Sequence, residues 1–375
     1  MLRLVLSSYI FFHIAIAMGQ PIITTEVLPK IGDTIIMASD NLPENIDALN
    51  RGDKQEWDFM GLQSAYGQKV AVKAIDKNHP TSLFSEANLM IEGTNDTEYF
   101  FKRPDKHSLD LIGIKGLDPL NLGISTTVYF APPLQYFHFP LKYGDKTQKE
   151  GSFYFKVAVQ DLPKEMIYSL PITPDSVRFR CKLTQQKEID AWGTLALPDN
   201  TYEVLREKHI ETRNYEVAVK NQKTSWENIT ADISKSLLPK KQVLTAYNFY
   251  SNEIRTKVAT VNMNPDNNQP KSVQYIVSEA SSNLRLPSGK ADIYAYPNPA
   301  INEVRFELSN LKPSTYILKI YNILGVVVQE ESYKLNGFKT VKLDISKLRK
   351  GTYLYSLADA KGKTVATRRL IVIRP

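Results

Sequence analysis

The residues able to do chemistry are scattered along this 375-residue chain. Four histidines follow the N-terminal apolar segment, and no two of them have the spacing of metal ligands: His79, His107, His138 and His209. The chain has no H-E-x-x-H, no G-x-S-x-G, no phosphate-binding glycine loop and only one cysteine. We therefore expect no metal and no cofactor and assign no catalytic residue, although catalytic groups can also come from distant positions.

An aromatic run at 128–140, VYFAPPLQYFHFP, is the clearest candidate for ligand binding. Aromatic side chains offer large flat surfaces that stack on sugar rings or line a hydrophobic groove. The same side chains could instead fill the core of a sheet, and both interpretations stay open. The candidate ligand platform consists of Tyr129, Phe130, Tyr136, Phe137 and Phe139.

Short alternating stretches bounded by turn residues make up residues 20–285. In GSFYFKVAVQ, Phe153 and Phe155 fall on one face and Tyr154 and Lys156 on the other. Such stretches, rich in Val, Ile, Tyr, Phe and Thr, are typical of strands joined by hairpins. We predict an all-β protein whose body is a large antiparallel β-sandwich, either one sandwich or two. The lone Cys181 in VRFRCKL is expected to pack as a small hydrophobe.

Two further features of the body are local. Pro43 suits the first turn of a helix, and one short helix is predicted at Glu44–Asn50. IDAWGTLALPDNTYEVLREK, at 189–208, is the most distinctive text of the body. Within it, Asp199 and Asn200 suit the tip of a turn between two strands.

The N-terminus reads as a targeting segment. Arg3 is followed by an apolar run to about Ala17, which is short for a bilayer span of ~20 residues. Small residues at Ala17 and Gly19 suit a cleavable secretory signal peptide, 1–19. We predict cleavage after Gly19, which leaves Gln20 first; the alternative is an uncleaved membrane anchor.

The last segment, 292–375, reads as a separate small β-sandwich. Pro297 and Pro299 favour extended geometry before them, and about seven strand-like stretches follow in roughly 80 residues, an immunoglobulin-like count. The stretch 286–291, with Pro287 and Gly289, is the predicted linker. We therefore place the domains at 20–285 and 292–375.

Charge separates the two domains. The whole chain carries a formal net charge of +7, and residues 292–375 alone hold 14 Lys and Arg against 7 Asp and Glu. Residues 20–291 hold 32 Lys and Arg against 33 Asp and Glu. A near-neutral body lacks the electrostatic footprint of a nucleic-acid-binding protein. No second apolar stretch is long enough to make an integral membrane protein.

Motifs in 292–375 follow one another in a recognisable order: YPNPA with Asn302, then IYNILG, LDISKLRKGTYLYSL, DAKGK and TRRLIVIRP. This segment resembles the C-terminal sorting domain of cargo proteins of the type IX secretion system, found in Bacteroidota. The residues that carry the resemblance are Tyr296, Pro297, Asn298, Pro299, Ala300, Asn302, Gly325, Leu343, Leu348, Gly351, Tyr353, Gly362, Arg368 and Arg369.

The resemblance implies a route and partners. The signal peptide would take the chain into the periplasm, and the C-terminal domain would dock on the outer-membrane translocon and its sorting machinery. Cleavage in the linker would leave the protein secreted or attached to surface lipopolysaccharide at the cell surface. Asp-Ser/Thr-aliphatic triplets at Thr34 and Ser176 resemble O-glycosylation sites of this phylum.

The body's own task stays open between two hypotheses. The first is a non-enzymatic surface protein that binds glycan, protein or cell surface. The alternative is an extracellular hydrolase acting on polymers through residues that the sequence does not identify. A deep pocket lined by two or more carboxylates, or by several histidines, would favour the hydrolase; a shallow aromatic face would favour binding.

Overall fold

The computed structural model describes residues 19–75, 84–93, 97–120, 122, 124–221, 225–233, 238–278 and 290–374. The predicted signal segment up to residue 18 and most of the predicted linker lie outside these ranges. Strands dominate, and the one α-helix among the described residues is α1 (Lys164–Ser169). The predicted helix at Glu44–Asn50 is wrong, because these residues form an irregular segment. No described helix is long and apolar enough to cross a membrane.

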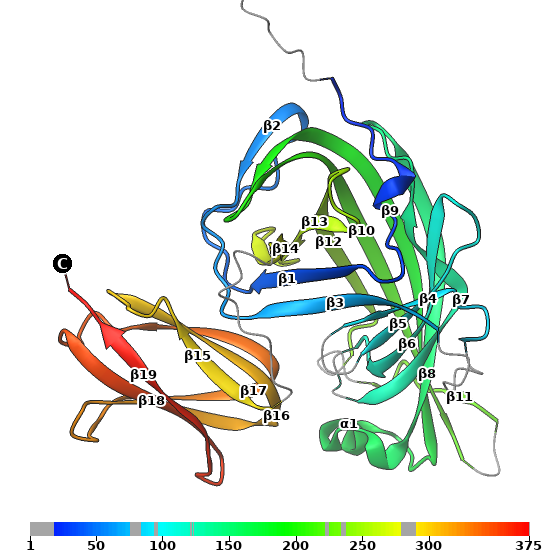
Figure 1. Ribbon diagram of the computed structural model, residues 1–375. Coiled ribbons are helices and arrows are strands. Elements are labelled where there is room, and N and C mark those ends of the chain that lie inside the picture. The colour runs from blue at the N-terminus through cyan, green and yellow to red at the C-terminus, as the bar shows by residue number, and fades with distance from the viewer. Residues whose placement is uncertain are drawn as a thin grey trace, which may run out of the picture.

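The body is a closed barrel of 12 strands, not the predicted sandwich (Figure 1). The ring closes because β9 pairs with both β8 and β10. Closure removes the free edges that a sandwich leaves at the ends of its two sheets. The strands run in the spatial order β10 (Thr201–Lys220), β12 (Lys241–Tyr250), β13 (Lys257–Met263), β14 (Pro270–Val277), β1 (Thr34–Asp40), β3 (Gly67–Ala74), β4 (Leu89–Glu92), β5 (Glu98–Lys102), β6 (Ser108–Leu117), β7 (Ser125–His138), β8 (Lys146–Ala158) and β9 (Ser176–Ala196).

Two short strands lie outside the ring: β11 (Glu227–Asn228) pairs with β10, and β2 (Gly52–Asp58) pairs with β9. The β2–β9 pair is parallel, whereas the other pairs described are antiparallel. The distinctive text at 189–208 forms the end of β9, a turn and the start of β10, and it receives β2. This text therefore encodes the junction at which an extra strand joins the barrel.

Gly193 shows how tightly that junction packs. A Cβ atom at this position would lie 1.9 Å from the backbone oxygen of Gln55 in β2. We expect Gly193→Ala to displace β2 and to lower the free energy of unfolding by ~1–3 kcal/mol, since overpacking against backbone cannot be relieved by a rotamer change. Thermal unfolding measures the loss. Gly61→Ala, where nothing lies within 4 Å, is the matched control; equal midpoints for the two variants would contradict the close approach.

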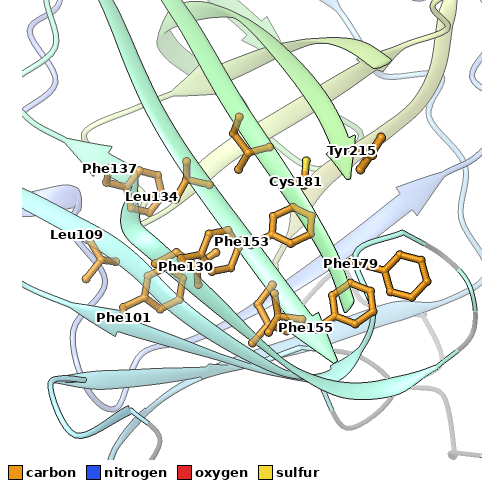
Figure 2. Packing of buried hydrophobic residues seen from close by; sticks show 14 of the residues in the cluster. Phe101, Leu109, Phe130, Leu134, Phe137, Phe153, Phe155, Phe179, Cys181 and Tyr215 are labelled. Carbon is orange, nitrogen blue, oxygen red and sulfur yellow. The ribbon is translucent and has the colours of Figure 1, made fainter. Parts of the chain in front are cut away.

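The larger core cluster fills the inside of the barrel. It takes side chains from β3 round to β10 and from β12, which only an interior face can bring together. Figure 2 shows its aromatic centre, with Phe155 and Phe179 stacked at 5.0 Å and Cys181 among them. Cys181 is fully buried, as predicted, and burial raises the pKa of its thiol to about 12, so the thiol is inert.

A second core cluster lies on the other face of β12. Tyr247 and Phe249 belong to it, whereas their neighbour Tyr250 belongs to the interior cluster, as strand alternation requires. Trp57 and Phe59, from the segment after β1, pack against Phe249 with ring centroids 5.1 and 5.6 Å away. The segment between β1 and β3 therefore covers the outer face of β12–β14.

The C-terminal domain has its own sheet of five strands and its own core. They are β15 (Asp292–Tyr296), β16 (Glu303–Tyr321), β17 (Val327–Asp344), β18 (Gly351–Asp359) and β19 (Thr364–Val372). The long strands β16 and β17 change register between Leu308 and Ser314. The first half of β16 pairs with β15 and the second half with β18, so the sheet folds over one core.

Candidate functional site

The inner face of the β9–β10 hairpin changes character along its length. Val177, Phe179, Cys181 and Leu183 on β9 face the interior core. The same alternation then places Gln185 and Lys187 on that face, opposite Glu211 and His209 of β10. The inward face of this hairpin is thus apolar in one half of its length and polar in the other half. We call Lys187, Glu207, His209, Glu211 and Lys257 the polar cluster.

Glu207 is the centre of the polar cluster. Its Oε1 accepts hydrogen bonds from Asn248 Nδ2 (2.8 Å) and from the Tyr250 hydroxyl (3.5 Å). His209 Nδ1 lies 4.0 Å from the same oxygen. Burial alone would raise the pKa of Glu207, but the charges of Lys187 and Lys257 and the Asn248 bond outweigh it and lower the pKa. Glu207 is therefore ionised inside the barrel.

The two lysines are held differently. Lys187 Nζ donates to the backbone oxygens of Gln135 (3.3 Å) and Tyr136 (3.5 Å). Lys257 Nζ lies 5.1 Å from the centroid of the Tyr136 ring, and among the described residues it has no hydrogen-bond acceptor. Burial lowers the pKa of both ammonium groups, while the carboxylates of Glu207 and Glu211 oppose that shift.

The second carboxylate, Glu211, accepts hydrogen bonds from Gln185 Nε2 (2.8 Å) and Arg213 Nε (2.7 Å). His209, between the two carboxylates, is neutral: burial and the neighbouring lysines lower its pKa to about 4 against the pull of Glu207. Its Nε2 is buried without a partner. An unsatisfied buried nitrogen lowers the stability of the folded state by ~1–3 kcal/mol, so His209 destabilises the barrel at this position.

Two cavities adjoin the polar cluster. The first cavity, about 250 Å³, is lined by Lys187 and Glu207 together with Tyr136, Phe137 and Phe139. The second cavity, about 440 Å³, is lined by His209, Glu211 and Lys257. The polar cluster therefore supplies charged groups to both cavities, of which the second reaches the size of small-molecule sites. No group of three His, Cys, Asp or Glu side chains suited to a metal occurs within the described ranges.

The polar cluster is not predictable from the sequence. Residues 184–190 and 203–214 carry charged residues on both strand faces, so the sequence does not show that the strand at VRFRCKL continues to the predicted turn at Asp199 and Asn200. The strands in fact run on to Ala196 and start at Thr201. A usable signal is the length of this hairpin, because ~20-residue strands exceed what one side of a small sandwich needs.

The predicted aromatic platform does not lie on one surface. Phe130, Phe137 and Phe139 are buried in the interior core, and Tyr136 packs against it. Tyr129 stacks on Tyr154 at 5.4 Å. Tyr136, Phe137 and Phe139 nevertheless line the first cavity, so a ligand-binding role for these three stays a prediction.

The remaining predicted sites of the body lie at exposed or half-exposed positions. Thr34 is exposed at the start of β1, and Ser176 is half-buried at the start of β9. Gly19 and Gln20 are exposed at the beginning of the described chain. Modification of Thr34 and Ser176, and cleavage between Gly19 and Gln20, stay predictions.

Motif residues at the start of the C-terminal domain connect it to the chain end. Asn298 Nδ2 donates to Arg369 O (2.8 Å), and Asn298 Oδ1 accepts from Ile371 N (2.8 Å). Ala300 is fully buried and pairs in parallel with Val372. Asn302 O accepts from Ile345 N (2.8 Å). The YPNPA motif thus binds the last strand, β19, to the start of the domain. Tyr296 ends β15, and Pro297 and Pro299 flank Asn298.

Other motif residues set turns and core positions. Gly325 and Gly362 take φ values of +78° and +81° in tight turns, a region that favours glycine. Tyr353 donates its hydroxyl to Arg349 O (2.8 Å) across the start of β18, which begins at Gly351. Leu343 is buried and Leu348 packs against the same core. These residues specify the shape of the domain.

The two arginines of the closing strand differ. Arg368 Nη2 donates to both carboxylate oxygens of Asp292 (2.8 and 2.7 Å), and its guanidinium lies 3.9 Å from the Tyr294 ring centroid. Arg369, the next residue, points to the other face and is exposed. Arg368 therefore ties β19 to β15, and Arg369 is the one of the two that is open to solvent.

Residues 294–373 match the family of secretion system C-terminal sorting domains. The C-terminal domain is a sorting domain. The chain thus carries the signal for export by the type IX secretion system, to the cell surface or the extracellular space.

Comparison with known proteins assigns no family to the rest of the chain. No curated protein matches the chain. Two solved structures from Porphyromonas gingivalis are similar to it: dimeric latent PorU (12% identity, TM-score 0.21, covering 92% of this chain and 30% of that one) and PorZ, a surface component of the type IX secretion system (11%, 0.20, 88% and 61%). The chain thus spans less than two thirds of either protein.

The sorting domain is docked on the barrel. Alternation along β16 turns Arg305, Glu307 and Ser309 away from the domain's own core, yet they are only 6%, 3% and 1% exposed. Arg305 Nη1 lies 3.0 Å from Asp40 Oδ1 at the end of β1. Glu307 Oε2 accepts a hydrogen bond from the Ala65 backbone N–H (2.8 Å). The barrel therefore covers a polar face of the sorting domain.

Docking is expected to depend on pH through Glu307. Burial and the nearby Asp40 carboxylate raise its pKa to about 7, against the Ala65 hydrogen bond. A raised carboxyl pKa means that docking is strongest below the free value of about 4.5, weakens as the pH rises towards 7, and is constant above it. After cleavage at a protease site placed in the linker, we expect retention of the sorting domain on a tagged barrel to fall on the order of 10²-fold between pH 5 and 8.

Glu307→Gln is the matched variant for this experiment, because the amide keeps the shape of the side chain and cannot titrate. It should make retention nearly independent of pH. Equal pH profiles for the wild-type protein and Glu307→Gln would contradict the assignment.

Proposed function

We propose that this protein is an exported binding protein that holds a small polar ligand inside its barrel. Export follows from the sorting domain; a signal peptide ending at Gly19, recognition by the translocon and release or attachment to lipopolysaccharide are further parts of the proposal. The observation that carries the binding function is the polar cluster, four charged side chains and the neutral His209, which lies inside the barrel and lines two cavities.

The cost of the polar cluster supports a functional role. Ionised groups inside a protein lose their hydration, and replacing such groups by apolar residues is often neutral or stabilising. The barrel already has a large apolar core on the same face. Lys187, Glu207 and Lys257 are therefore not needed to close the core. A ligand that completes their hydrogen bonds would account for them.

A hydrolase is the second candidate, favoured by the carboxylates of Asp145 and Glu207 in the lining of the first cavity. Two carboxylates on one cavity are the minimum for general acid–base hydrolysis of glycosides. Both are already engaged, however. Asp145 Oδ2 accepts from the Lys142 backbone N–H (2.8 Å), and Glu207 accepts from Asn248. Binding is therefore the function that the geometry supports better.

A screen of the chain from residue 20 onward, sorting domain included, tests both candidates. Glycans, sugar monomers and small polar metabolites are offered at equilibrium, and binding and product formation are measured together. The proposal expects saturable binding without turnover, and weaker binding by Glu207→Gln. Turnover that Glu207→Gln abolishes would establish the hydrolase instead. Absence of binding to every compound class would overturn the proposal.

A further inference from the structure

The second cavity has an unbalanced charge. Arg213, Lys257 and Lys271 line it together with one carboxylate, that of Glu211. The ion pair between Arg213 and Glu211, 2.7 Å long, uses that carboxylate. Within the described part of the chain, Lys257 and Lys271 have no ion pair. The cavity wall therefore holds two ammonium groups that make no ion pair with a described residue, and the carboxylates of Glu207 and Glu211 act on Lys257 only from beyond ion-pair distance.

Lys257 is the more informative of the two, because Lys271 is exposed to water. Lys257 is partly buried, and its ammonium group lies over the Tyr136 ring, 5.1 Å from the ring centroid. An ammonium group has three donors, and those of Lys257 have no acceptor among the described residues. An anion in the second cavity would supply the acceptor that the described residues do not.

The rest of the lining is neutral and forms hydrogen bonds. Six lining residues carry amide or hydroxyl groups: Gln242, Thr245, Asn248, Thr260, Asn262 and Ser272. Four of them already hydrogen-bond to one another or to Glu207, and each of these four keeps further donor or acceptor capacity. Phe, Tyr and Trp are absent from the lining residues identified in the described structure. Stacking of an aromatic ring therefore has no platform here, whereas a ligand with several hydroxyl groups has many partners.

We propose that the second cavity binds a small sugar acid, with Lys257 as the residue that binds its carboxylate. The remaining hydroxyl groups of the sugar would meet the amide and hydroxyl side chains around it. The cavity volume, about 440 Å³, lies within the ~300–1,000 Å³ of small-molecule sites. The inference rests on the proposed binding function and names its ligand class.

Titration calorimetry with matched sugars tests the inference. D-Galacturonate, its methyl ester and D-galactose differ at one carbon, which carries a carboxylate, a neutral ester or a hydroxyl-bearing group. We expect galacturonate to bind at least 10-fold more tightly than the other two, since a hydrogen bond to a charged group contributes ~1.5–3 kcal/mol. The ester comparison needs no protein variant and is therefore independent of folding defects.

Lys257→Met locates the effect, because Met keeps most of the side-chain length and removes the charge. It should reduce the preference for galacturonate over galactose to less than 3-fold. Lys241→Met is the matched control: Lys241 is exposed on β12 and lines neither cavity. It should leave the preference unchanged.

Two results would overturn the inference. Equal binding of galacturonate and galactose by the wild-type protein would show that the ligand need not be a sugar acid, while the proposed binding function would still stand. If Lys257→Met still preferred galacturonate, a residue other than Lys257 would bind the carboxylate, and the assignment would be wrong. If neither sugar binds, the ligand class is wrong, and the broader screen decides separately whether the barrel binds a ligand at all.

Discussion

Removal of residues 292–375 is expected to abolish export. The truncated chain should accumulate inside the cell envelope, with at least 10-fold less protein at the surface and in the medium than for the full chain. The physical reason is that the motif residues hold one folded unit together: the Asn298 hydrogen bonds, the Tyr353–Arg349 hydrogen bond and the Arg368–Asp292 ion pair all lie within this segment. Cell fractionation followed by immunoblotting measures the distribution.

Truncation also uncovers Asp40 and Ala65 on the barrel. Loss of export through misfolding of the barrel must therefore be distinguished from loss of export through absence of the sorting domain. Circular dichroism of the truncated protein checks that the barrel is still folded. Fusion of residues 290–375 to a periplasmic reporter is the converse test, and the reporter should reach the surface. A truncated chain that appears outside the cell in full amounts would contradict the export route.

Glu207→Ala is expected to cost ~3–5 kcal/mol of stability, the largest effect of any single side chain in the polar cluster. Loss of this carboxylate leaves the partly buried Lys187 and Lys257 without the counter-charge that most strongly favours their ionised form, and it leaves Asn248 Nδ2 without its acceptor. Urea unfolding followed by tryptophan fluorescence measures the loss in the barrel alone, because all three tryptophans precede residue 292.

Glu203→Ala provides the control for this variant. Glu203 is exposed on the same strand, and surface substitutions of this kind usually change stability by less than ~0.5 kcal/mol. A loss below ~1 kcal/mol for Glu207→Ala would show that the charges of the polar cluster are solvated, and the account of a buried site would then fail.

Strand alternation made the all-β class predictable, and the motifs of 292–375 made the sorting domain predictable. Both signals are local: each strand or turn carries its own pattern within about ten residues. Barrel closure is different, because it depends on β10 pairing with β12 and on the order in which β14, β1 and β3 meet. Nothing in the alternation of one strand specifies which distant strand lies beside it.

The polar cluster was unpredictable for a related reason. Lys187, Glu207 and His209 alternate with other polar residues, so both strand faces look solvated in the sequence. Only the closed ring turns one of these faces inward. The aromatic run was recognisable as sequence, yet the choice between core and ligand surface depends on packing that places Phe137 and Phe139 at the wall of the first cavity.

The ring resonances of His209 offer the most direct measurement of the central claim, that the barrel binds its ligand at the polar cluster. His209 is neutral, lines the second cavity and is the only histidine of the polar cluster. In a protein labelled with ¹⁵N-histidine, the account predicts that addition of galacturonate shifts the ring nitrogens of His209 and saturates with the calorimetric binding curve. Binding that saturates while the His209 resonances stay in place would contradict it.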